Sequence, residues 1–156
     1  MPEEPLDVIS GTVSLPYQWT TGPAGARFLA GLREGKVLGT RCPQCRRVLV
    51  PARSFCPRCF VDTSEWVQVS ERGRLRTYTI INYRFEGQPK KPPYIIGIID
   101  LEGADVGFVH FIGEVDLSDF GKVEEVLKPG TLLQAVWAKE RQGRITDIEH
   151  FVPVIQ

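Results

Sequence analysis

The sequence predicts a mainly β protein with an N-terminal helix, then a rubredoxin-like zinc ribbon, and then a five-stranded barrel of the OB type. Three observations predict this fold. All four cysteines fall in one paired pattern, the chain after residue 74 is built of runs rich in Ile, Val, Tyr, Phe and Thr, and a short helical stretch interrupts these runs. We expect an arm and helix over 1–35, the ribbon over 36–69 and the barrel over 70–156.

The composition is that of a globular protein, with 42% hydrophobic and 24% charged residues. No apolar run approaches the roughly 20 residues that cross a bilayer. The acidic start MPEEPLDVIS lacks the basic and apolar blocks of a signal peptide. We therefore expect a cytoplasmic protein that does not bind membranes.

Charge is unevenly distributed along the chain. Residues 27–91 hold 14 of the 19 Lys and Arg but only five of the 19 Asp and Glu. This basic segment is either part of an ordinary mixed surface or a face that attracts a polyanion. The net charge of zero argues against a protein that coats nucleic acid non-specifically.

The N-terminal residues contain more apolar surface than they can bury among themselves, so we expect them to bind another surface. Residues 1–15 combine acids and prolines without any period, which is typical of a mobile or partner-dependent arm. A helix follows over 23–34 and ends at Gly35. Tyr17 and Trp19 add more aromatic surface than a short helix buries against itself. We expect this segment to dock either on the barrel or on another protein.

Short strand-like pieces flank the cysteines, over 36–40, 48–50 and 66–69. Five longer pieces follow, over 75–85, 94–101, 106–115, 132–138 and 145–152. A short helix, capped by Ser118, separates the third of these from the fourth. This order is expected of an OB barrel, although the periodicity alone supports an SH3-like barrel almost as well.

The four cysteines are Cys42, Cys45, Cys56 and Cys59. Each Cys-x-x-Cys pair forms a knuckle with two thiolates, and two knuckles complete a tetrahedron around one Zn²⁺. The closed shell leaves no position for substrate or water, so the site is expected to be structural. Iron with the same ligands remains an alternative. A cytosolic context disfavours disulfides, and two matched pairs fit a single redox-active dithiol poorly.

Four stretches together resemble an acyl-CoA-associated family that joins a zinc ribbon to an OB fold. They are FLAGLREGKVLGTRCPQCRRVLVPARSFCPRCF, Trp66, VSERGRLRTYTII and PYIIGIIDLEG. The similarity runs from about Tyr17 to Val152. The sequence departs from the usual pattern in two places: Arg46 rather than glycine follows the first knuckle, and the turn at residues 70–73 has two extra residues.

Members of that family stand beside thiolase-like enzymes, as separate subunits or as fused domains. The resemblance implies a non-catalytic accessory subunit that forms a hetero-oligomer with a thiolase- or aldolase-type acyl-CoA enzyme. It also implies a part in binding CoA or acyl-CoA. It does not identify the pathway.

An independent enzyme is not expected, because the cysteines are committed to metal. The two histidines, His110 and His150, lie in strand-like runs, where a structural histidine is more common than a catalytic one. Asp100 and Glu102 precede Gly103 and predict a hairpin turn rather than a pair of catalytic carboxylates.

Alternation along the first barrel strand places Arg74, Arg76 and Tyr78 on one basic and aromatic face. Such a face suits either single-stranded nucleic acid or the adenine and phosphates of CoA. Two lysines stand among three prolines in the loop 86–93, and an aromatic residue that suits stacking on a purine follows this loop. The resemblance favours CoA over nucleic acid. The expected anion site consists of Arg74, Arg76, Tyr78, Lys90, Lys91 and Tyr94.

Overall fold

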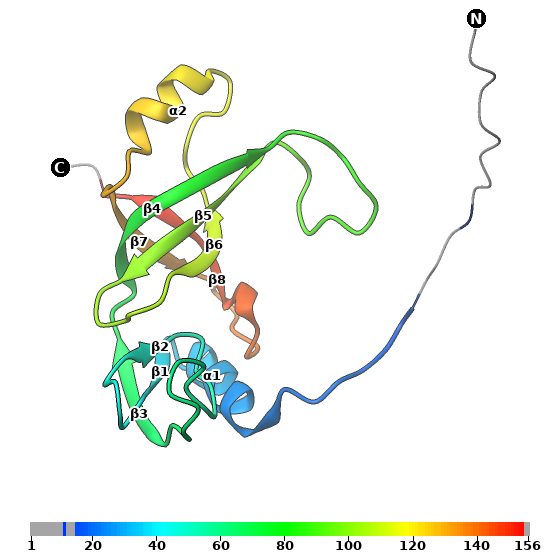
Figure 1. The fold of residues 1–156 in the computed structure, drawn as a ribbon. Helices are drawn as coiled ribbons and strands as arrows, with labels where there is room; N and C mark the ends of the chain where they lie inside the picture. Colours follow the sequence, from blue (N-terminus) through cyan, green and yellow to red (C-terminus); the bar gives the residue numbers. More distant parts are fainter. Residues whose placement is uncertain (1–10, 12–14, 155–156) are drawn as a thin grey trace, which may run out of the picture.

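The computed structural model describes residue 11 and residues 15–154. The arm predicted over 1–15 thus lies almost entirely outside the described residues. The elements in chain order are α1 (Gly22–Arg33), β1 (Val37–Arg41), β2 (Val48–Leu49), β3 (Glu65–Val69), β4 (Arg72–Ile81), β5 (Tyr94–Leu101), β6 (Phe108–Ile112), α2 (Phe120–Val126), β7 (Leu132–Trp137), the 3₁₀ turn η1 (Ile145–Asp147) and β8 (Ile148–Pro153). Figure 1 shows a small sheet with α1 beside it, and above them a barrel capped at its far end by α2.

Helix α1 packs one apolar stripe against the rest of the protein. A proline in the first turn favours its start. The helix ends at Arg33, and Gly35 just beyond it has a φ of 73°, in the left-handed region that glycine adopts without a clash. Phe28 and Leu32, one turn apart, are buried. Arg33 donates to a carbonyl of the loop before β8 at 3.0 Å. The predicted helix is confirmed, with each end one residue earlier than the expected 23–34.

The larger sheet is a closed barrel with the strand order β4-β5-β6-β8-β7. β6 and β8 pair parallel, the other barrel pairs are antiparallel, and α2 stands between the third and fourth barrel strands. This is the OB arrangement, so the expected mainly β class with a five-stranded barrel is confirmed.

The short helix α2 begins one residue later than the sequence suggests. Asp119, not Ser118, caps it, because the Asp119 Oδ1 accepts from the Gly121 N–H at 2.9 Å. Within the described ranges, neither α-helix has the length and apolar character that a membrane crossing requires.

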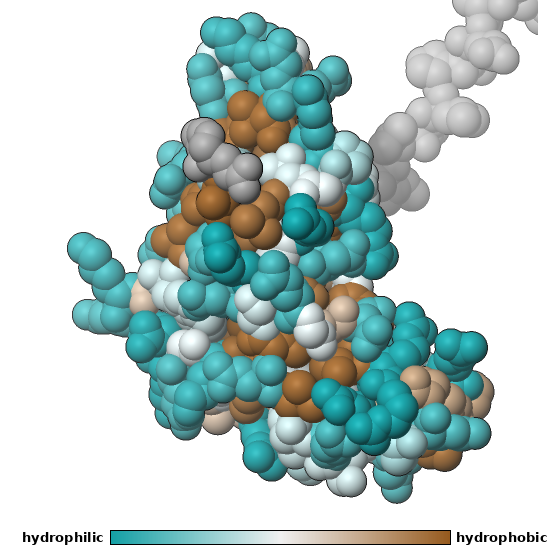
Figure 2. Space-filling view, turned by 90° about the vertical axis from the view of Figure 1, so that its left-hand side faces the viewer, coloured by the Kyte–Doolittle hydropathy of each residue, from teal (hydrophilic) through white to brown (hydrophobic). Residues whose placement is uncertain are grey.

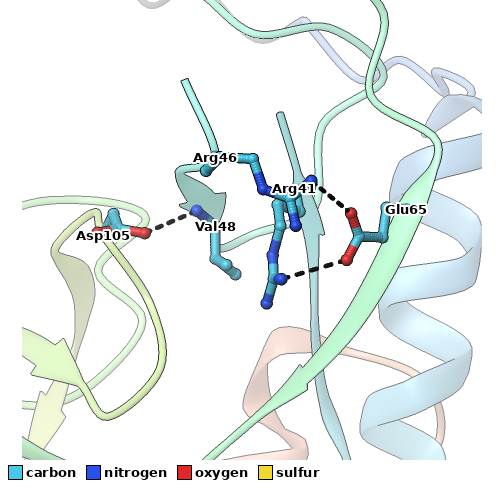
Figure 3. Close-up of polar contacts among 5 residues, drawn as sticks. All are labelled: Arg41, Arg46, Val48, Glu65 and Asp105. Atoms are coloured by element: carbon cyan, nitrogen blue, oxygen red, sulfur yellow. Dashed lines mark hydrogen bonds and ion pairs between the residues drawn. The ribbon is translucent and has the colours of Figure 1, made fainter. Parts of the chain in front are cut away.

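The small sheet has the order β2-β1-β3, and Asp105 joins it to the barrel. The Asp105 Oδ2 accepts from the Val48 N–H at 2.8 Å, and the Asp105 N–H donates to the Val48 carbonyl at 2.9 Å. Figure 3 shows this contact beside Glu65, whose carboxylate pairs with both Arg41 and Arg46, at 3.3 Å each. The loop between β5 and β6 thus fixes β2 against the barrel.

One continuous apolar core links the helix, the small sheet and the barrel. Its buried members include Phe28, Leu32, Val37, Val48, Val69, Leu75, Ile99, Phe108, Leu133 and Phe151. Burying one such side chain contributes roughly 1.5–3 kcal/mol. Damage to the small sheet is therefore expected to weaken the barrel as well.

A buried carboxylate holds the loop where α1 meets the barrel. Asp147 is 3% exposed and accepts from the N–H groups of Gln142, Gly143 and Arg144 at 3.0, 2.7 and 3.2 Å. Burial raises the pKa of this carboxyl, but the three backbone hydrogen bonds outweigh it and hold the pKa below its usual range. Its contribution to stability is complete above the unfolded pKa of about 3.9 and is lost as the pH falls through the lower folded value.

Candidate metal centre and anion-binding loop

The ribbon brings its four cysteine sulfurs to one point. All four Sγ atoms lie within 4.8 Å of one another, and Sγ of Cys45 is 3.8 Å from Sγ of Cys56. A tetrahedron with Zn–S bonds of about 2.3 Å has S···S edges of about 3.8 Å. The donor set and its spacing therefore fit one Zn²⁺.

Backbone hydrogen bonds shape both knuckles in the same way. The Arg46 N–H donates to the Cys42 carbonyl at 3.0 Å, and the Phe60 N–H donates to the Cys56 carbonyl at 2.8 Å. The residue after the second cysteine of each knuckle adopts a left-handed conformation, with φ of 63° at Arg46 and 56° at Phe60. This turn aims both cysteines of a pair at the same point.

The pKa values of Cys42 and Cys59 are shifted in opposite directions. Burial opposes ionisation of Cys42, but hydrogen bonds from the N–H groups of Cys45 and Gln44 and from neighbouring thiols outweigh it and lower its pKa to about 6. Burial, together with the neighbouring thiols, raises the pKa of Cys59 to about 12. Four thiols this close ionise one after another, so a divalent cation is the natural partner of the fully ionised set.

The metal centre is closed. Cys42 and Cys56 are buried, Cys45 and Cys59 are half-buried, and the four sulfurs complete the tetrahedron. A bound Zn²⁺ would supply folding energy here rather than a Lewis acid for substrate. The predicted ligand set is the one that the fold brings together.

The predicted basic and aromatic face of β4 is wrong, because a β-bulge interrupts the strand. Leu75 pairs with Ile99 and Thr77 pairs with Ile98, so Arg76 is the extra residue. After the bulge, the side chains of β4 again alternate between the two faces of the sheet, but with the faces exchanged. Arg76 is exposed on the outside, whereas Tyr78 packs against the core. Tyr78 therefore lies on the other side of the sheet from the arginines.

Both arginines predicted for the anion site, Arg74 and Arg76, already have partners. Arg74 donates to the Gly130 carbonyl at 3.1 Å. Arg76 forms a two-pronged ion pair with Asp100 on β5, which raises the pKa of Arg76 through a hydrogen bond and through charge attraction. They lie near the start of β4, whereas the lysine loop follows its end. The expected grouping of Arg74 and Arg76 with Lys90 and Lys91 is therefore not found.

The loop between β4 and β5 forms a basic hollow of its own. Lys90 and Lys91 line a cavity of about 500 Å³ together with Arg84, Phe85 and other residues of the loop. Figure 1 shows this loop hanging from the end of the barrel. Sequence reasoning did not assign Arg84 to this group, because it placed residue 84 in the strand expected over 75–85. In the structure β4 ends at Ile81, so Arg84 belongs to the loop.

Tyr94 does not present its ring to a ligand. It is 8% exposed and meets the Phe111 ring edge to face, with centroids 5.7 Å apart. The Lys90 ammonium lies 4.4 Å from the centre of the same Phe111 ring. Lys90 of the loop thus reaches Phe111 on β6, and Tyr94 is buried against the same ring, which corrects the expected role of Tyr94 in stacking on a purine.

The two histidines differ in burial, since His110 is buried and His150 is half-buried. His110 is 6% exposed, stacks on Phe108 and lies 3.2 Å from the Ile145 carbonyl through Nε2. Burial lowers its pKa, although its backbone hydrogen bonds oppose the shift. His150 lies 3.7 Å from the Glu114 carboxylate.

Comparison with known proteins defines the class. Residues 29–65 match the family described as "ChsH2, rubredoxin-like zinc ribbon domain", and residues 66–138 match "ChsH2, C-terminal OB-fold domain". A DUF35-family protein of unknown function from Sulfolobus solfataricus is 31% identical, with a TM-score of 0.55. That alignment covers 74% of this chain and 78% of the other. The chain belongs to the DUF35 family of zinc-ribbon and OB-fold proteins.

The names of some relatives describe a scaffold protein or an enzyme subunit. A "DUF35 domain-containing scaffold protein" of Methanocaldococcus jannaschii is 36% identical over 67 residues, 42% of this chain and 48% of that one. "Benzoylsuccinyl-CoA thiolase subunit BbsA" of Thauera aromatica is 39% identical over 64 residues, 40% of this chain and 42% of that one. The chain thus spans about half the length of these curated relatives. The solved "Ltp2-ChsH2(DUF35) aldolase" shares the fold, with a TM-score of 0.62 at 15% identity over 84% of this chain and 94% of that one.

Proposed function

We propose that this chain is a non-catalytic accessory subunit of a thiolase- or aldolase-type acyl-CoA enzyme. The chain holds this enzyme in a complex and helps the enzyme to bind CoA. Membership of a family whose relatives are named scaffolds and subunits carries this proposal. The closed cysteine site and the burial of His110 fit a chain that leaves the chemistry to its partner.

Exposed apolar surface supports a protein partner. Tyr17 and Trp19 are 78% and 72% exposed, so the part of the chain that the structure describes does not cover these two rings. Figure 2 shows further hydrophobic side chains on the face below α2. Phe120 and Val126 of that helix are about half exposed, and Val126 borders a small hollow beside β8. Apolar surface of this kind is typical of a subunit that is covered in its complex.

The experiment that tests the proposal is reconstitution. The tagged chain is purified gently from its native cell, the co-eluting protein is identified, and both are expressed and mixed. We expect a stable complex with a thiolase-fold enzyme whose acyl-CoA turnover requires this chain. The isolated chain should turn over no acyl-CoA. Recovery of ribosomal or replication proteins instead would assign the chain to single-stranded nucleic acid.

The lysine loop is the candidate CoA contact. Lys90 and Lys91 share one hollow with Arg84, and CoA carries three phosphate groups that such cations bind. Losing one exposed contact of this kind costs roughly 0.5–1.5 kcal/mol. We expect Lys90→Ala with Lys91→Ala to raise the Michaelis constant of the reconstituted complex for acyl-CoA about tenfold, with assembly and zinc content unchanged.

A matched control is Lys128→Ala with Lys139→Ala, which removes the same charge from exposed positions outside the loop. This control should leave the Michaelis constant unchanged. If the loop variant keeps normal CoA kinetics but loses oligonucleotide affinity with a steep salt dependence, the nucleic-acid function is correct instead.

A further inference from the structure

The second zinc knuckle holds a bulky residue in an unfavourable backbone conformation. Phe60 has a φ of 56°, a region that side-chain-bearing residues avoid because Cβ crowds the backbone. The knuckle hydrogen bonds impose this conformation: the Phe60 N–H donates to the Cys56 carbonyl, and the Cys56 N–H donates to the Val61 carbonyl, at 2.8 Å each. Glycine would meet the same geometry without that steric cost.

Packing within the chain does not compensate for this cost. The Phe60 side chain is 83% exposed, the largest exposure among the large hydrophobic residues of the described ranges. Phe55, which bridges to Asp62 across the same knuckle, is 49% exposed, and Pro57 between them is exposed as well. We call Phe55, Pro57 and Phe60 the knuckle surface. This surface is apolar and is held on a rigid turn by the metal ligands.

The charges around the knuckle surface favour an acidic partner. Arg53 and Arg58 are exposed, and within residues 15–154 neither of them forms an ion pair. Asp62 is the one acid in the segment 53–62. The first knuckle differs, because Glu65 neutralises Arg41 and Arg46 there. An apolar pocket with carboxylates on its rim complements the second knuckle in both shape and charge.

We propose that Phe60 is an anchor that inserts into an apolar, acid-rimmed pocket of the acyl-CoA enzyme that this chain holds. This proposal rests on the proposed function. An aromatic side chain on a rigid turn loses little conformational freedom on binding, which is the property of an interface hot spot. A large side chain that is both strained and exposed in the free chain is explained when its contacts come from another protein.

Phe60→Gly separates this role from a structural one, because the two roles predict opposite changes. In the isolated chain we expect zinc to be retained and the melting temperature to stay the same or rise by a few degrees, since the strain is relieved and little packing is lost. In the reconstituted complex we expect affinity for the purified partner enzyme to fall at least tenfold. Both are measured on the same preparations, by thermal unfolding and by calorimetric titration.

Arg46→Gly is the matched control, because it places glycine at the same left-handed position of the other knuckle. Its affinity for the partner should stay within about twofold of the unaltered chain. Arg58→Glu tests the acidic rim: affinity should fall at least threefold at low salt, and the loss should shrink as salt is added.

Each remaining outcome decides the question. Unchanged partner affinity in Phe60→Gly overturns the anchor and leaves the proposed function intact, whereas failure of the unaltered chain to bind any acyl-CoA enzyme overturns the proposed function. If the unaltered chain self-associates and Phe60→Gly is monomeric, the occupant is a second copy and the proposal is wrong. If Phe60→Gly loses zinc, the variant Phe60→Asn is measured in the same assays, since asparagine tolerates this conformation. A second loss of zinc would make Phe60 a structural residue and end the proposal.

Discussion

Cys42→Ser is expected to release the metal and unfold the ribbon. Serine offers no thiolate, and Cys42 is a buried member of a four-sulfur set. Structural zinc in zinc-finger peptides contributes about 10–16 kcal/mol of apparent binding free energy at neutral pH, and that binding energy is folding energy. The buried hydrophobic cluster around the metal site consists of Cys42, Cys56 and Leu49, so this part of the ribbon is not expected to survive without the ion.

The effect should reach the barrel. Val37, Val48 and Val69 of the small sheet belong to the same core as the barrel strands. We therefore expect a lower melting temperature for the whole chain, not only loss of ribbon signals. Elemental analysis should give one zinc per unaltered chain and less than a tenth of that in the variant.

Ser54→Ala is a suitable control, because Ser54 lies exposed between the knuckles and its side chain is not a metal ligand. It should keep its zinc and its stability. A strong chelator applied to the unaltered chain should reproduce the Cys42→Ser result. Iron in the purified protein, or a folded ribbon in the metal-free variant, would contradict the prediction.

The metal centre and the order of the elements could be predicted because their signals are local. The cysteine spacing alone brings two thiolates into each knuckle, and each barrel strand has its own run of β-forming residues. The helix that ends just before Gly35 also has its stop signal in the sequence. These features depend on residues a few positions apart, which is the range that sequence reasoning covers well.

The anion face could not be predicted in the same way. A single extra residue at Arg76 reverses which side chains of β4 point inward, and no residue type there marks a bulge. Tyr94 is buried against Phe111 of the neighbouring strand β6, which is a contact set by tertiary structure. The lysine loop could be predicted as a candidate anion site because its prolines and lysines are adjacent in the sequence. This prediction did not require its packing.

The N-terminal segment is expected to be the other main contact with the partner enzyme. Leu15, Tyr17 and Trp19 alternate with Pro16, Gln18 and Thr20, which gives a period of two. The three apolar side chains are each more than 70% exposed, and Figure 1 shows the segment leaving the ribbon as an extended chain. An extended segment with one apolar edge is suited to lie along a sheet edge or groove of another protein.

Tyr17→Ser with Trp19→Ser should therefore weaken the reconstituted complex at least a hundredfold. Buried aromatic anchors at interfaces contribute 2 kcal/mol or more each, and every 1.4 kcal/mol is tenfold in affinity. The melting temperature of the isolated chain should not change, because neither ring packs on this chain. Gln18→Ser, between the two, should bind normally. A fall in melting temperature would mean that the segment docks on its own barrel in solution, and unchanged affinity would mean that the partner is held by other surfaces.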